Sequence, residues 1–160
     1  MDNQKLLAIL RTAQRDHDTT GFNEFDFMHA FGSGREALLY ARLFWPQFVE
    51  YNDMVFLSST AEGPEDKRRI DETLRSYGGD RVKTEESFNV VEIPILFGRR
   101  IAETTEEEDR FLTELIMEAW HGRLRLLYPN RDFQTRILEP NDTGGEIAIL
   151  FSQRPKTDQV

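Results

Sequence analysis

The sequence contains no cysteine among its 160 residues. This absence excludes disulfides, thiolate metal sites and cysteine nucleophiles, and it favours a reducing compartment. Long hydrophobic runs are also absent: the densest one, Val90 to Phe97, is broken by Glu92 and Pro94 and is too short to span a bilayer. The N-terminal residues lack the basic region and cleavage site of a signal peptide. We therefore expect a soluble, cytoplasmic protein.

Motifs for catalysis or metal binding are scarce as well. The chain has only three histidines, and no H-x-x-x-H or H-E-x-x-H spacing joins them. Gly32-Ser33-Gly34 precedes a predicted helix but lacks the Lys-Ser/Thr pair of a P-loop, and the spacing around Ser33 does not fit a nucleophile elbow. The sequence therefore predicts no metal site and no cofactor, and it identifies no catalytic residue.

Basic residues are fewer than acidic ones: the chain has 20 basic and 29 acidic residues, and its formal net charge is −9. Binding to nucleic acid or to an anionic membrane requires positive charge, so neither partner is expected. The acidic excess is concentrated: seven acids and one base lie between Ile101 and Glu118, whereas four bases and one acid follow between Ala119 and Arg136. A concentrated negative charge is compatible with a basic protein partner.

The best-specified element is a helix within Thr104 to Leu127. Apolar residues recur in this segment at helical spacing. Thr104 or Thr105 is the expected N-cap, with Glu107 or Glu108 completing a capping box three residues later. The acids at its start lie at the positive end of the helix dipole, which favours the same boundaries.

The first third of the chain predicts two helices around an irregular segment. Asn3 to Arg15 has an apolar helical face, and Arg35 to Phe44 forms a second helix that ends before Pro46. Periodicity fails from Asp16 to Gly34, so we expect an irregular stretch in the residues 1–34. Its aromatic segment, Phe22 to Phe31, either packs on the core or docks on another subunit and forms a homo-oligomer.

The remaining segments predict a mixture of strands and helices. The apolar Met54 to Ser58 reads as a central strand, paired with Phe48 to Tyr51 through a turn at Asn52-Asp53. Pro64 begins an outer helix that ends near Tyr77. Two further strands are joined by a turn with the sequence PNDTGG, and they cover Asp132 to Glu139 and Glu146 to Ser152.

One segment is ambiguous, and the fold class follows from the rest. Asp80 to Phe97 fits a short helix followed by an extended turn, but Val90 to Phe97 also fits a buried strand interrupted at Pro94. We expect a single α+β domain over 1–160, with an antiparallel sheet of about four strands, four to five helices packed on it and a frayed tail at 153–160.

Two hypotheses for function follow, from different classes. Capping explains one or two of the acids at the start of the long helix, so the others are available to a partner. The first hypothesis is a non-catalytic interaction module, such as an inhibitor or immunity-type protein, that binds a basic partner. Its binding residues are Glu103, Glu106, Glu107, Glu108 and Asp109.

The second hypothesis is a small-ligand binding protein or a hydrolase with a pocket between sheet and helices. Glu50 and Glu92 lie among apolar neighbours, and His121 lies near the C-terminal part of the long helix. Burial would raise the pKa of such a carboxyl group and make it a usable acid or base. Acidic side chains are rarely buried without a partner, which favours surface positions for both glutamates.

Overall fold

The computed structural model describes residues 3–97, 104–143 and 145–154. Within these ranges, none of the helices combines the length and the apolar character that crossing a membrane requires. The chain divides into two compact units, Met1–Leu43 and Phe44–Val160, which are described in turn. That both fold as one domain over 1–160 stays a prediction.

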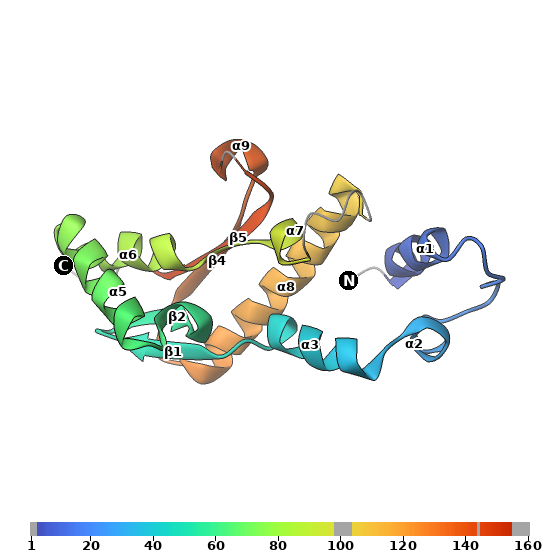
Figure 1. Cartoon of the computed structure of the whole chain (residues 1–160), viewed down its shortest axis with the longest axis horizontal. Helices are drawn as coiled ribbons and strands as arrows, with labels where there is room; N and C mark the ends of the chain where they lie inside the picture. Colours follow the sequence, from blue (N-terminus) through green and yellow to red (C-terminus); the bar gives the residue numbers. More distant parts are fainter. Residues whose placement is uncertain (1–2, 98–103, 144, 155–160) are drawn as a thin grey trace. The chain divides into compact units, whose positions relative to one another are not determined.

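The first unit contains α1 (Asn3–Ala13), α2 (Glu24–Phe31) and most of α3 (Gly34–Phe44), drawn in blue and cyan in Figure 1. The predictions of α1 and α3 are confirmed. The prediction of an irregular stretch over 16–34 is wrong where α2 forms. Its N-cap is Asn23, whose side chain accepts hydrogen bonds from the N–H groups of Phe25 and Asp26, while Asp26 accepts one from the Asn23 N–H. An Asn/Asp pair therefore builds the capping box that more commonly uses Ser/Thr and Glu.

The aromatic segment Phe22 to Phe31 divides between the interior and the surface. The buried ring of Phe27 contacts those of Phe22 and Phe31, at centroid distances of 5.5 and 6.1 Å. Phe25 and Met28 are 71% and 63% exposed on the same helix. Self-association through this segment stays a prediction.

The second unit begins with a tight hairpin. Strands β1 (Phe48–Tyr51) and β2 (Met54–Leu57) pair antiparallel, with Tyr51 opposite Met54, as the sequence predicts. Asn52 and Asp53 occupy the turn with φ values of +52° and +60°. Positive φ at both central positions is the signature of a type I′ turn, whose twist matches that of the flanking strands.

The second sheet has three strands in the order β3-β5-β4. The central strand β5 (Ala148–Gln153) pairs antiparallel with both β3 (Val90–Glu92) and β4 (Phe133–Leu138). Both β4 and β5 correspond to predicted strands. The short helix α9 (Pro140–Thr143) lies within the predicted turn between them. At the C-terminus, Gln153 belongs to β5 and the N–H of Arg154 donates to Asp132 O, whereas the rest of the predicted tail, 155–160, lies outside the described residues.

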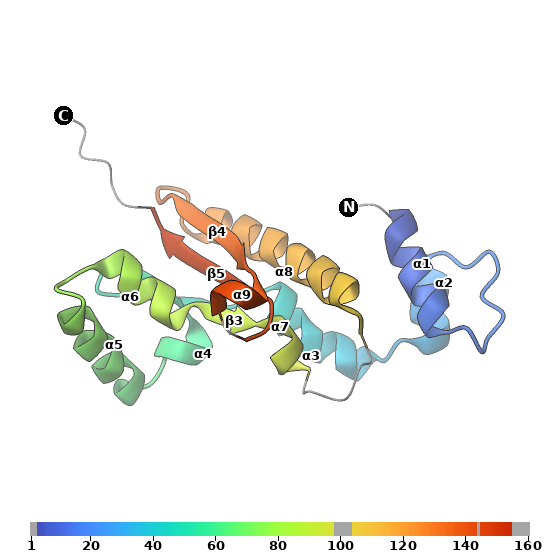
Figure 2. The ribbon, with the colours of Figure 1, turned by 90° about the horizontal axis from the view of Figure 1, so that it is seen from above.

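Helices pack against both sheets. The long helix α8 (Glu106–Leu127) contacts β4 and β5, as Figure 1 and Figure 2 show, and α6 (Arg81–Phe88) contacts both β2 and β5. Next to α6 lies α5 (Pro64–Ser76), which matches the helix expected from Pro64. The short helices α4 (Ser58–Ala61) and α7 (Ile93–Leu96) follow β2 and β3 directly.

The core of this unit joins the two sheets to α8. Phe151 of β5 lies edge-on to Phe48 of β1 and to Trp120 of α8, with ring centroids 5.2 and 6.1 Å apart. Trp120, Ile116 and Phe151 are all buried. Burial of each such side chain contributes on the order of 2 kcal/mol, so these contacts fix how α8 lies on the sheet.

The α+β class is confirmed, but the expectation of about four strands in one sheet is wrong. The strands form sheets of two and three. All four residues of β2 are buried, yet β2 is not a central strand: side chains of α6 and of the residue after it occupy its outer edge. The ambiguous segment resolves into a helix (α6), a three-residue strand (β3) and a helical turn (α7), so Val90 to Phe97 is part strand and part helix.

Candidate functional site

The start of α8 confirms the predicted capping box. Thr105 is the N-cap: its hydroxyl accepts a hydrogen bond from the Glu108 N–H, and Glu108 Oε2 accepts one from the Thr105 N–H at 2.7 Å. The Thr104 hydroxyl donates to Asp109 Oδ1, also at 2.7 Å. Glu108 therefore serves the cap and Asp109 is held by a neighbour, while Glu106 and Glu107 take no part in the capping box.

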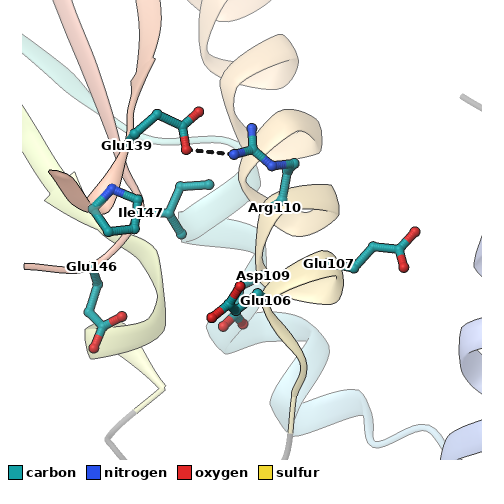
Figure 3. Close-up of a pocket in the computed structure, with 8 residues that line it drawn as sticks. Glu106, Glu107, Asp109, Arg110, Glu139, Glu146 and Ile147 are labelled. Carbon is teal, nitrogen blue, oxygen red and sulfur yellow. Dashed lines mark hydrogen bonds and ion pairs between the residues drawn. The ribbon is translucent and has the colours of Figure 1, made fainter. Parts of the chain in front are cut away.

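An acidic pocket lies beside this first turn, with a volume of about 440 Å³. Three of its carboxylates come from α8 and two from the connection between β4 and β5. Pro140 and Ile147 contribute apolar surface, and Arg110 is the one cation among the lining residues that the structure describes. Figure 3 shows the pocket between α8 and the connection. Its five carboxylates belong to Glu106, Glu107, Asp109, Glu139 and Glu146.

Arg110 already forms an ion pair with Glu139, one of the lining carboxylates. Arg110 donates from Nη2 to Glu139 Oε2 at 2.5 Å, which ties α8 to the end of β4. This hydrogen bond with Glu139 raises the pKa of Arg110 above its ordinary value. In Figure 3, Glu106 and Asp109 are drawn at the first turn of α8, whereas Glu107 points to the other side of the helix. The described lining is therefore negatively charged, because it has four carboxylates in addition to the Arg110–Glu139 pair.

The residues predicted to bind a partner have different positions. Glu106, Glu107 and Asp109 line the acidic pocket. Glu108 is not among the lining residues and belongs to the capping box. Glu103 lies outside the described residues.

Sequence reasoning missed Glu139 and Glu146. They flank the turn sequence PNDTGG, so each ends or precedes a strand of the same hairpin. That spacing indicates that the two acids share one end of the hairpin. It does not reveal that the start of α8 is next to them, because this depends on how α8 packs along β4.

The residues of the alternative hypothesis have three separate sets of neighbours. Glu50 accepts a hydrogen bond from Arg131. Glu92 lies against Gly145, where its carboxylate occupies the space that a Cβ would need. His121 Nδ1 lies 3.3 Å from the Thr135 hydroxyl. None of them lines the acidic pocket or either of two further pockets formed by described residues.

A buried carboxylate that the sequence did not single out lies at the junction of the two sheets. Glu85 of α6 is 1% exposed and accepts hydrogen bonds at 2.7 Å from the Val55 N–H, the Gln153 N–H and the Gln153 side-chain amide. Burial raises the pKa of this carboxyl group, while the hydrogen bonds from Gln153 and Val55 and the charge of Arg131 oppose the rise. Both carboxylate oxygens accept hydrogen bonds from groups within the protein, which indicates a structural role for Glu85.

Neither metal-site geometry nor comparison with known proteins adds a functional assignment. Across the part of the chain that the structure describes, no group of three or more His, Asp or Glu side chains is arranged to hold a metal ion. No family model matches the chain, and neither a curated protein nor a solved structure matches it.

Proposed function

We propose that this chain is a small, non-catalytic interaction module whose acidic pocket binds a basic segment of a partner protein. One observation carries the proposal: the acids at the start of α8 do not merely follow one another in sequence, but share a pocket with two acids of the β4–β5 connection. Capping requires only Glu108 of this group. An inhibitor or immunity-type protein that neutralises a basic effector is one form of such a module.

The lining favours a long cationic side chain as the group that enters the pocket. An arginine or lysine has an aliphatic stem that packs on apolar surface and a charged head that stays with polar groups. Pro140 and Ile147 offer the apolar surface, and Glu106, Asp109 and Glu146 offer acceptors for the head. Hydrogen bonds between a guanidinium and carboxylates are about twice as strong as neutral ones.

The net charge of the chain supports the same partner. A formal charge of −9 attracts a basic protein over distances of about one Debye length, roughly 8 Å at physiological salt. Such attraction accelerates the encounter and makes it sensitive to salt. A partner bound through the acidic pocket is therefore expected to dissociate as the salt concentration rises.

The test compares two double charge reversals on α8. Glu106→Lys with Glu107→Lys alters the acidic pocket while leaving the Thr105–Glu108 capping box intact. Glu114→Lys with Glu118→Lys reverses the same number of charges on exposed positions further along the helix. A pull-down from native-source lysate, washed at low and high salt, is quantified for both variants and the wild type.

The proposal predicts a stoichiometric basic protein that is released by salt, retained by the Glu114/Glu118 variant and lost by the Glu106/Glu107 variant. Equal retention by both variants would exclude the acidic pocket as the binding site. Equal loss would show that net charge alone drives the capture. Circular dichroism of both variants establishes that α8 is still folded.

A further inference from the structure

A second pocket, which we name the arginine pocket, differs from the acidic pocket in chemical character because its lining brings cations together. It has a volume of about 540 Å³ and its lining includes Arg81, Arg131 and Arg154. Two carboxylates, Asp53 and Glu85, also line it. Among the lining residues that the structure describes, three arginines accompany these two carboxylates, in a chain with a formal charge of −9.

Separate elements bring the three arginines together. Arg81 is the first residue of α6, Arg131 precedes β4, and Arg154 follows β5. The β1–β2 turn, the start of α6 and the end of β5 lie at the same end of the second unit (Figure 1 and Figure 2).

Asp53 links two of these arginines. Arg81 Nη1 donates to Asp53 Oδ2, and Arg131 Nη1 donates to the Asp53 carbonyl oxygen, both at 3.2 Å. Gln153 also donates to this carbonyl, at 2.7 Å, and Arg154 is the next residue. A single turn residue therefore bonds to two guanidinium groups, and Arg154 lines the same pocket.

The existing partners of Arg81 and Arg154 are weakly held. Arg81 pairs with Asp53 and Arg154 pairs with Asp132, at 3.2 and 3.3 Å, through side chains that are 57% to 70% exposed. Exposed pairs of this kind contribute little to stability, so an entering anion exchanges with them at little cost. Each guanidinium has five N–H donors, and each of these two pairs uses few of them.

Arg131 is held more firmly and gives the pocket a fixed cation. Its second nitrogen, Nη2, donates to Glu50 Oε1 at 2.5 Å, and its guanidinium lies 5.5 Å from the centre of the Tyr128 ring. The Arg131 side chain is only 25% exposed. An anion that reaches the pocket thus meets one oriented guanidinium and two that can turn toward it.

Glu85, the buried acid in the wall, already has partners within the protein. It accepts three N–H hydrogen bonds and interacts with the charge of Arg131, so Glu85 and Arg131 offset part of each other's charge. We propose that the arginine pocket binds a small oxyanion, a phosphate or carboxylate group, through Arg81, Arg131 and Arg154. Two or three guanidinium groups around one oxyanion supply charge-assisted hydrogen bonds with the geometry that phosphate and carboxylate accept.

The experiment is an amide NMR titration of the full chain with inorganic phosphate, with citrate as the carboxylate probe, and with sodium chloride at matched ionic strength. The proposal predicts saturable shifts for amides of the arginine pocket, such as Val82 and Asp53, with phosphate or citrate and not with chloride. The probe that saturates at the lower concentration identifies which oxyanion the pocket prefers.

Variants locate the site. Arg154→Gln and Arg81→Gln are each expected to weaken binding about tenfold or more, since each loses hydrogen bonds to a charged ligand. Arg136→Gln removes an exposed, ion-paired arginine outside the pocket and is expected to bind as the wild type does. Shifts that rise linearly and match the chloride series would overturn the proposal, as would equal weakening by Arg136→Gln. Retained dispersion of the amide spectrum shows that each variant is folded.

Discussion

The carboxylate of Glu85 and the backbone of Gln153 are joined by a 2.7 Å hydrogen bond that connects α6 to the end of β5. Its other oxygen accepts the Val55 N–H of β2 at the same distance. The Glu85 side chain thus accepts backbone hydrogen bonds from a strand of each sheet, β2 and β5. At this junction a side chain of α6 connects two small sheets, whereas the sequence analysis expected one sheet of about four strands.

Glu85 is expected to make stability depend on pH in a direction opposite to that of most carboxylates. Burial raises its pKa above the ordinary value of 4.5, so the folded state binds the proton more tightly than the unfolded chain does. The stabilising contribution of the protonated form is fully present below pH 4.5 and is lost as the pH rises through the raised pKa.

The measurement is urea unfolding of the wild type and Glu85→Gln between mildly acidic and neutral pH. The free energy of unfolding of the wild type minus that of Glu85→Gln is expected to fall as the pH rises from 4.5. Glu118→Gln, which changes an exposed carboxylate of α8, serves as the control. A difference for Glu85→Gln that is constant with pH would contradict the prediction.

Replacement of Asn89 by alanine is expected to destabilise the second unit. Asn89 Nδ2 donates to Val55 O at 2.8 Å, and its Oδ1 accepts the Leu57 N–H at 3.2 Å. Removing the side chain leaves two buried backbone groups of β2 without these partners, at about 1–3 kcal/mol for each. We expect Asn89→Ala to lower the free energy of unfolding by about 3 kcal/mol in urea titrations. Asn130→Ala, at an exposed position, is expected to change it by less than about 0.5 kcal/mol.

Local signals in the sequence predicted several elements because their causes are local. The Thr105–Glu108 capping box involves residues three apart, and the β1–β2 turn depends on two adjacent residues that tolerate positive φ. Helical periodicity likewise needs only the segment itself, which is why α1, α3, α5 and α8 correspond to predicted helices.

The junction between the sheets was not predictable by the same means. Glu85 and Asn89 are polar residues four apart on a segment without a clear apolar face, so their spacing alone resembles a solvated helix surface. Their partners lie 30 to 68 residues away along the chain. The acidic pocket shows the same division: its α8 acids were found from the sequence, whereas Glu139 and Glu146 join them only through the packing of α8 beside the hairpin.

The N-cap of α8 can be assigned to one of two adjacent threonines. Thr105 accepts the Glu108 N–H, whereas Thr104 bonds only to the Asp109 side chain. Thr105→Ala is expected to lower the free energy of unfolding by about 1 kcal/mol, the usual cost of losing an N-cap. Thr104→Ala breaks a hydrogen bond between exposed side chains and is expected to cost less. Amide exchange in the first turn of α8 provides a second measurement, and equal exchange in both variants would contradict the assignment.

Two substitutions at Asp53, in the β1–β2 turn, distinguish the effect of backbone conformation on stability from the effect of the side-chain charge. Asp53 adopts a φ of +60°, and its side chain pairs with Arg81 at the surface. Asp53→Gly and Asp53→Ala both remove this ion pair, so any difference between them reports on the backbone alone. Glycine occupies positive φ without a steric penalty, whereas alanine in this region costs about 1 kcal/mol. We expect Asp53→Gly to exceed Asp53→Ala in the free energy of unfolding by about that amount in matched urea titrations. Equal stabilities would show that the turn changes its conformation when the aspartate is removed.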